Sequence, residues 1–87
     1  MKSRLSPSFR KEFSNLPDTI KLRASMAYRK WKRTPNLPGL FFKRVENEPP
    51  TYSVRIGLDY RALGVVRGDT IIWFWIGKHD EYDRLLS

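Results

Sequence analysis

The chain has 87 residues, enough for one small domain with a single core, and we expect one domain over residues 1–87. It contains no cysteine, which excludes disulfide bonds and thiolate zinc sites and fits a reducing cytoplasm, the location we expect. No apolar run reaches the roughly 18 residues of a membrane helix, so we expect no membrane partner.

The positive charge is concentrated in the N-terminal half of the chain, whose net charge is +8. Residues 1–50 carry 12 Lys and Arg against 4 Asp and Glu, whereas residues 51–87 carry 5 of each kind. A field of this sign attracts nucleic acid, an acidic protein or an anionic membrane. The substrate or partner is therefore expected to be an anion.

A short helix is predicted near the N-terminus. Ser6 followed by Pro7 is typical of a helix start and predicts a helix over Pro7–Ser14. Phe9 and Phe13 lie four residues apart, so both face one side of this helix and should be buried.

A longer helix is predicted over Asp18–Arg33. One apolar stripe follows helical spacing and comprises Leu16, Ile20, Ala24, Ala27 and Trp31. Four cations fall outside this stripe, towards solvent, namely Lys21, Arg29, Lys32 and Arg33. Such a basic face either is simply solvated or contacts RNA.

The rest of the chain has the pattern of strands. Four runs are predicted, over Leu40–Val45, Tyr52–Ile56, Tyr60–Arg67 and Thr70–Ile76. The last run is typical of a strand buried on both faces, so Trp73 and Trp75 should lie in the core. A closing helical segment is predicted over Asp80–Leu86. Two helices followed by four strands predict an α+β fold, with two N-terminal helices packed on a four-stranded antiparallel sheet and a short C-terminal helix.

Two arginines are predicted to meet on the sheet. If residues 57–59 form a three-residue loop, Arg55 lies opposite Arg61 and Val54 lies opposite Ala62. Like charges in that position cost a few tenths of a kcal/mol or more, a cost that an anion between them would remove, and two guanidinium groups suit a phosphate. The alternatives are that both arginines are solvated, or that they pair with Asp59 and Asp69.

His79 and Tyr82 directly follow the last predicted strand. Histidine can donate or accept a proton near neutral pH, so His79 is a candidate general acid or base, or else an exposed loop residue. Tyr82 is a candidate stacking platform for a base, or a core anchor of the last helix. The neighbouring carboxylates have no recognisable metal-ligand spacing, and we expect no metal.

These segments together resemble a known family. The strings YSVRI at 52–56, DYRALG at 59–64 and WIGKHDEYDRLL at 75–86 resemble the RelE/ParE superfamily of toxins from type II toxin–antitoxin systems, and in particular its RelE-like branch. The resemblance implies a RelE-like toxin domain and an mRNA endoribonuclease that acts on translating ribosomes. The cleavage reaction that the resemblance implies needs neither metal nor cofactor, because the substrate's own 2′-hydroxyl attacks the phosphate.

The resemblance also implies roles for individual residues. Arg55, Arg61, His79 and Tyr82 match the catalytic positions, although many members have Arg in place of His79, and some have Lys in place of Ser53. Further phosphate contacts are expected at Lys43, Lys78 and Arg84, and RNA contacts at Lys21, Arg29, Lys32 and Arg33. The implied partners are an antitoxin protein, mRNA and the ribosome. The alternatives are a ParE-like gyrase inhibitor without enzymatic activity, and an inactive relative that only binds RNA or an antitoxin.

Overall fold

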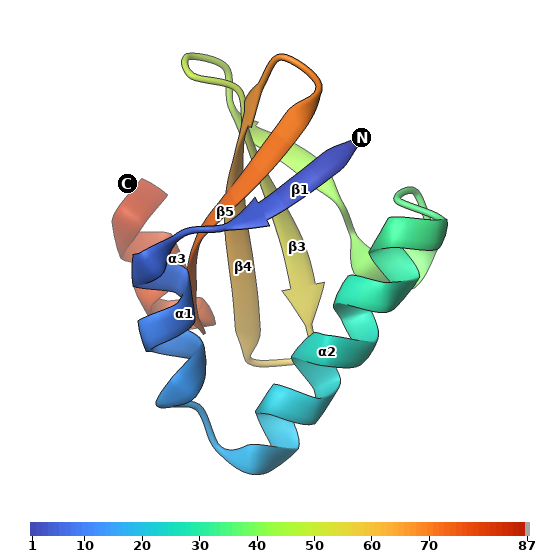
Figure 1. The fold of residues 1–87 in the computed structure, drawn as a ribbon. Coiled ribbons are helices and arrows are strands. Elements are labelled where there is room, and N and C mark those ends of the chain that lie inside the picture. Colours follow the sequence, from blue (N-terminus) through green and yellow to red (C-terminus); the bar gives the residue numbers. More distant parts are fainter. Residues whose placement is uncertain (87) are drawn as a thin grey trace.

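One mixed sheet forms the centre of the protein, with helices on both sides (Figure 1). The computed structural model describes the backbone of residues 1–86 and the side chains of residues 1–84. Its elements are β1 (Lys2–Leu5), α1 (Pro7–Ser14), α2 (Asp18–Arg33), a 3-10 turn η1 (Pro38–Leu40), β2 (Lys43–Glu46), β3 (Thr51–Ile56), β4 (Tyr60–Arg67), β5 (Thr70–Lys78) and α3 (His79–Leu86). The strand order is β1-β5-β4-β3-β2.

Both predicted N-terminal helices are confirmed at their predicted bounds. The side-chain oxygen of Ser6 accepts a hydrogen bond from the Phe9 amide at 3.1 Å, which caps α1. Phe9 is buried, and its ring stacks with that of Phe13 at 6.4 Å between centroids. Of the predicted apolar stripe, Ala24 and Trp31 on α2 are buried in the core, and Leu16 and Ala27 pack against it. No helix in the described residues is long and apolar enough to cross a membrane.

The prediction of a four-stranded antiparallel sheet is wrong. A fifth strand, β1, pairs in parallel with β5, with Leu5 opposite Trp73, so the sheet is mixed. Its sequence, KSRL, contains one apolar residue, and no local pattern distinguishes it from a polar tail. The strand forms because β5 offers it an open edge.

The first predicted strand also begins later than expected. Over Leu40–Val45 the chain first completes η1 and then passes through Phe41, whose φ of 49° is left-handed. A left-handed residue cannot continue a strand, so β2 starts only at Lys43. The remaining strand predictions and the closing helix agree with the structure within two residues.

A bulge in the β4–β5 pairing directs two tryptophans to opposite faces of the sheet. Leu63 is opposite Trp75 and Gly64 is opposite Trp73, which leaves Phe74 between them without a partner. Trp73 therefore joins the core under α1 and α2, where its ring meets Trp31 edge-on at 5.3 Å. Trp75 lies on the other face with Leu63. The side chains of Leu63, Trp73 and Trp75 are all buried. The prediction that this strand is buried on both faces is confirmed.

Helix α1 covers the edge of β5 beyond the end of β1. The Ser8 hydroxyl donates a hydrogen bond to the Phe74 carbonyl at 2.9 Å. One carboxylate oxygen of Glu12 accepts from the Ile76 amide at 3.4 Å. These side chains satisfy backbone groups that β1 is too short to reach, and they hold the end of β5 that leads into α3.

We predict that Gly64→Ala destabilises the fold. A Cβ at Gly64 would lie 2.8 Å from both Ile71 Cγ1 and Trp73 Cε3, inside a buried layer that cannot easily move. Overpacking of this kind typically costs about 1–3 kcal/mol. Chemical denaturation would measure the loss. The matched control is Gly39→Ala, where a Cβ meets nothing within 4 Å. Equal stabilities of the two variants would contradict the close packing of β4 on β5.

Candidate functional site

The hairpin between β3 and β4 brings Arg55 and Arg61 together, as predicted. The loop has three residues, and Gly57 in it has a φ of +65°, a conformation that glycine adopts without strain. Arg55 is directly opposite Arg61, and Val54 is opposite Ala62. Ala62 belongs to the core under the helices. The two arginines therefore project from the other face of the sheet.

Arg61 is half-buried in a partly compensated electrostatic environment. Burial lowers its pKa most, and the positive charge of Arg55 lowers it further. The opposite effect comes from Tyr82, Asp83 and Asp59, which raise the Arg61 pKa. The guanidinium also donates a hydrogen bond to the Tyr60 carbonyl, with 2.8 Å between Nη1 and the oxygen. Arg61 is thus a fixed, partly desolvated cation whose neighbours all come from the end of the sheet and from α3.

The Arg55 side chain extends towards Phe41, in the segment before β2. Its guanidinium carbon lies 4.7 Å from the centre of the Phe41 ring, which is a cation–π arrangement. Its Nε atom is buried and has no hydrogen-bond partner in the described part of the protein. Arg55 therefore connects the arginine pair with the segment around Phe41.

His79 and Tyr82 both lie on α3, where their rings stack at 5.8 Å between centroids. The His79 amide donates a 2.6 Å hydrogen bond to the Asp59 carbonyl, which ties the start of α3 to the β3–β4 loop. The imidazole Nδ1 is 3.5 Å from an Asp83 carboxylate oxygen, one helical turn further on. His79 remains 44% exposed at its side chain, so its ring is accessible to a substrate. Helix α3 thus brings these two rings to the sheet end that carries Arg61.

The suggested pairing of the arginines with acids is wrong for Asp69. Asp69 lies in the turn between β4 and β5, at the opposite end of β4 from Arg61, and contacts Lys2 at 3.9 Å. Within residues 1–84, neither Arg55 nor Arg61 forms an ion pair, and Asp59 acts on Arg61 only at longer range. The same part of the chain holds no group of three His, Cys, Asp or Glu side chains arranged to hold a metal ion.

The other predicted RNA contacts are spread over several surfaces. Lys43 is exposed and is the cross-strand partner of Ser53, which puts it on the Arg55 face. Lys78 is opposite Tyr60, so it projects from the other face at the same end of the sheet. Arg84 is exposed on α3. The α2 cations lie on the helix layer, with Lys21 half-buried and the others exposed, namely Arg29, Lys32 and Arg33.

Two cations that sequence reasoning missed lie next to Arg55. Arg23 and Lys30 on α2 line a pocket of about 220 Å³ together with Arg55 and Gly57. Their spacing of seven residues puts them on one side of the helix, and this was the available sequence signal. Phe41 was also missed, and no sequence pattern reveals that its ring is exposed beside an arginine.

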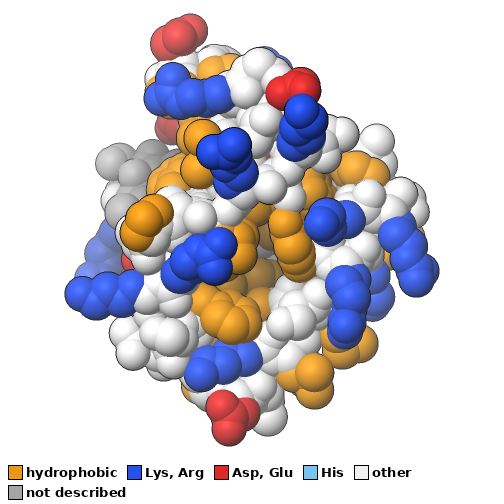
Figure 2. Space-filling model, viewed as in Figure 1, with side chains coloured by type: hydrophobic (Ala, Val, Ile, Leu, Met, Phe, Trp, Pro, Cys, Tyr) orange, Lys and Arg blue, Asp and Glu red, His pale blue; other side chains and the backbone are white. Residues whose placement is uncertain are grey.

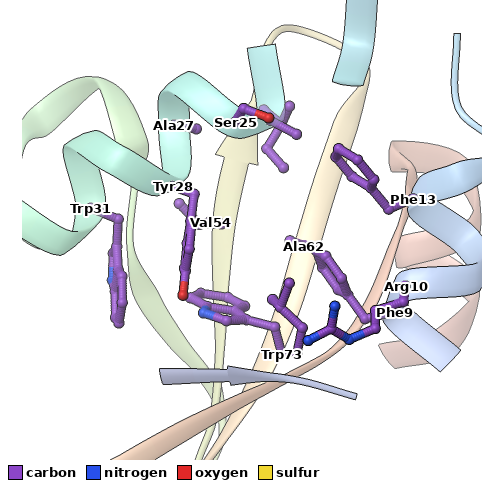
Figure 3. A pocket seen from close by; sticks show the side chains of 13 residues that line it. Phe9, Arg10, Phe13, Ser25, Ala27, Tyr28, Trp31, Val54, Ala62 and Trp73 are labelled. Atoms are coloured by element: carbon purple, nitrogen blue, oxygen red, sulfur yellow. The ribbon is translucent and has the colours of Figure 1, made fainter. Parts of the chain in front are cut away.

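A larger hollow lies on the helix face of the sheet. It measures about 370 Å³ and is lined mainly by apolar side chains between α1 and α2. Figure 2 shows this hollow as an apolar surface with Lys and Arg side chains around it. In Figure 3, Phe9 and Phe13 from α1 and Tyr28 and Trp31 from α2 form its walls, with Trp73 at its floor. We call it the interhelical groove; the arginine pair projects from the opposite face.

Comparison with known proteins decides the family. A family model of the ParE-like toxin domain matches residues 18–84, which include β2 to β5 and most of α3. The chain belongs to the ParE-like toxin domain family. It is a toxin of the RelE/ParE superfamily of toxin–antitoxin systems. No curated protein sequence matches this ParE-like toxin significantly.

Solved structures share the fold of this ParE-like toxin. One is a RelB–RelE antitoxin–toxin complex from Methanococcus jannaschii, with a TM-score of 0.70, 21% identity, and coverage of 95% of this chain and 98% of that one. Another is a YoeB/ParE toxin from Agrobacterium tumefaciens, with a TM-score of 0.70, 17% identity and coverage of 91% and 99%. A third is an archaeal RelE–RelB complex from Pyrococcus horikoshii, with a TM-score of 0.67, 17% identity and coverage of 88% and 92%.

We predict a pH-dependent stability difference between this ParE-like toxin and its Glu12→Gln variant. Burial raises the Glu12 pKa above its ordinary 4.5, the Glu81 charge raises it further, and the Ile76 amide partly offsets both. The folded state therefore binds a proton where the unfolded state has lost it, and the free energy of unfolding falls as pH rises through the window just above 4.5. The glutamine keeps an oxygen for Ile76 and removes this dependence.

Denaturation of both proteins at several pH values should show the stability of Glu12→Gln relative to wild type increasing from acidic to neutral pH. The same change at the exposed Glu48 controls for the general loss of one charge. A difference that stays constant across this range would contradict the raised pKa.

Proposed function

We propose that this toxin is an mRNA endoribonuclease that acts on translating ribosomes. The observation that carries the proposal is the half-buried Arg61, opposite Arg55, with Tyr82 and Asp83 close enough to shift its pKa. Two cations and two groups capable of proton transfer, at one end of a sheet, suit cleavage of a phosphodiester. The substrate's 2′-hydroxyl attacks the adjacent phosphate, and a 2′,3′-cyclic phosphate and a 5′-hydroxyl are the products.

Arg55 and Arg61 stabilise the charge that develops on the phosphorane. Neither forms an ion pair within residues 1–84, so both are available for phosphate oxygens. A preorganised donor in a partly desolvated site contributes about 3 kcal/mol to transition-state stabilisation. Lys43 on the same face, with Lys78 and Arg84 at the same end, would bind flanking phosphates, and the α2 cations Lys21, Arg29, Lys32 and Arg33 would contact ribosomal RNA.

His79 acts as general acid or base, and Tyr82 acts as base or stacking platform. The 3.5 Å approach of Asp83 to His79 Nδ1 supports a positioning role for Asp83, because a carboxylate there orients the ring and favours a proton on that nitrogen. The other ring nitrogen is then the one left for proton exchange with the substrate. This assignment gives the imidazole one proton to exchange with the 2′-oxygen or the leaving 5′-oxygen.

Gyrase inhibition without enzymatic activity is the second candidate function. It is favoured by the ParE-like family model that matches residues 18–84. The arginine pair and the stacked His79 and Tyr82 favour the nuclease, because a protein that only binds gyrase has no need of them. An inactive relative that only binds RNA or an antitoxin is the third candidate.

An antitoxin protein is the partner that we propose. Two similar structures are antitoxin–toxin complexes, from Methanococcus jannaschii and Pyrococcus horikoshii. The interhelical groove supports this partner, since an apolar hollow of about 370 Å³ surrounded by cations suits an amphipathic acidic segment. The groove and the arginine pair lie on opposite faces of the sheet, so the antitoxin and the RNA would have separate surfaces.

We predict that Arg61→Ala slows cleavage of a defined mRNA roughly a hundredfold or more, because one preorganised donor is lost. His79→Ala should also cost at least about a hundredfold, since it removes a proton-transfer group. The purified protein would be tested with and without programmed ribosomes, with end mapping to detect the cyclic phosphate. Arg67→Ala, which removes one charge at the far end of β4, is the matched control and should cleave as the wild type does.

The outcome also separates the candidate functions. Cuts in the ribosomal A site that are lost in Arg61→Ala would support a ribosome-dependent nuclease. If the folded wild type cuts neither ribosome-bound nor free mRNA, and growth arrest is accompanied by gyrase-trapped linear DNA, the nuclease proposal is wrong and the gyrase inhibitor is favoured. A folded protein with neither effect would be the inactive relative.

We predict that the antitoxin associates by electrostatic steering. With a net charge of +8, association with an acidic partner should slow roughly tenfold or more between low and high salt. Stopped-flow mixing with the antitoxin that relieves growth arrest would measure the rate at about 0.05 and 0.5 M salt. An association rate that does not change with salt would contradict an acidic partner.

A further inference from the structure

The cationic pocket beside Arg55 is distinct from the interhelical groove. It measures about 220 Å³ and opens between α2, the segment around η1 and the end of β3. Arg23 and Lys30 come from α2, Leu37 and Gly39 from the η1 segment, and Arg55 from β3. We call it the edge pocket, because β2 pairs only with the first part of β3 and leaves this end of β3 as a sheet edge.

The edge pocket has the charge of an anion site. Three of its lining side chains are cations and none is an acid. Within residues 1–84, Arg23, Lys30 and Arg55 form no ion pair. Arg23 Nη1 lies against the loop, since a Cβ built on Gly57 would approach it to 3.2 Å. Three like charges around one hollow repel each other, and a bound phosphate would relieve that repulsion.

Phe41 adds an aromatic surface next to the edge pocket. It is 56% exposed, although phenylalanine is usually buried. Its left-handed backbone, with φ at 49°, turns the chain between η1 and β2. Arg55, which lines the pocket, has its guanidinium over this ring. An exposed aromatic ring beside cations is the arrangement on which proteins stack the bases of single-stranded nucleic acid.

From these observations we propose that the edge pocket binds a nucleotide that flanks the cleaved phosphate. Arg23 and Lys30 hold its phosphate, and Phe41 stacks on its base. Arg55 is shared, because it lines the pocket and is the cross-strand partner of Arg61. The proposal rests on the ribonuclease function proposed above, and it extends the substrate path from the arginine pair across the edge of β3.

The combination of features favours RNA over an acidic protein segment at this place. A nucleotide uses both the cations and the exposed ring, and the pocket joins the proposed cleavage site through Arg55. A helical or extended protein segment needs a long apolar surface, which the interhelical groove offers on the other face. If substitutions in the edge pocket weaken binding of the antitoxin and leave RNA binding unchanged, the proposal is therefore wrong.

A fluorescent RNA tests the site without depending on cleavage. The probe is an RNA oligonucleotide with a 2′-deoxy group at the cut position, which blocks cleavage, and 2-aminopurine next to it. Stacking on Phe41 quenches 2-aminopurine, so the wild type should quench it on binding. Phe41→Leu keeps apolar volume without a π-face and should bind about tenfold more weakly with the quenching lost, whereas Phe41→Trp should restore both.

The charged part of the pocket has its own matched controls. Arg23→Ala and Lys30→Ala should each weaken binding several-fold and lower the salt dependence by about one phosphate contact. Arg67→Ala removes the same charge at the far end of β4 and should bind as the wild type does. Leu22→Ala removes an exposed apolar side chain from α2, outside the edge pocket, and should also have no effect.

Failure of the site and failure of the nuclease give different results. Wild-type affinity and quenching in Phe41→Leu, in a protein that cleaves mRNA, would overturn the edge pocket and leave the nuclease intact. Quenching that depends on Phe41, in a wild type that cleaves no mRNA with or without ribosomes, would support the nucleotide site and overturn the ribonuclease. No binding of the probe at low salt would overturn the edge pocket.

Discussion

The register between β4 and its two neighbouring strands positions the groups of the candidate site. Arg61 faces Arg55 across β3 and Gly77 across β5, while the adjacent Ala62 faces the core. A slip of one residue would turn Arg61 towards the apolar layer under α2 and expose Ala62. Burying an unpaired cation costs several kcal/mol, which is comparable to the whole stability of a small domain. The apolar core thus enforces the register that holds the arginine pair on the other face.

The bulge at Leu63 and Gly64 gives each face of the sheet one tryptophan of β5. It sends Trp73 into the core beneath α1 and α2, and Trp75 to the face that carries Arg61. The indole of Trp75 folds over Gly77, where a Cβ would lie 2.6 Å from the ring, so this position accommodates only glycine without a shift. The surfaces proposed for the antitoxin and for RNA therefore belong to different faces that share one strand.

The sequence was sufficient to predict those elements whose local residue pattern agrees with the strand pairing and packing of the fold. Helical spacing predicted α1 and α2, and alternation with a three-residue loop predicted the Arg55–Arg61 pair. It was insufficient for β1, because a short polar segment becomes a strand only through parallel pairing with β5, far along the chain. The edge pocket depends in the same way on how α2 crosses the end of β3, which no local pattern determines.

Three energetically unfavourable features of this chain lie close together around Arg55. Two arginines face each other across strands, and a phenylalanine is exposed with left-handed backbone, a conformation that costs roughly 1 kcal/mol or more. The buried Nε of Arg55 has no partner within residues 1–84. Local signals agree with the fold through α1, α2 and β5, so these costs do not reflect a poorly specified chain. Their proximity to one another supports the proposed edge pocket, where an anionic ligand would offset two of the three costs.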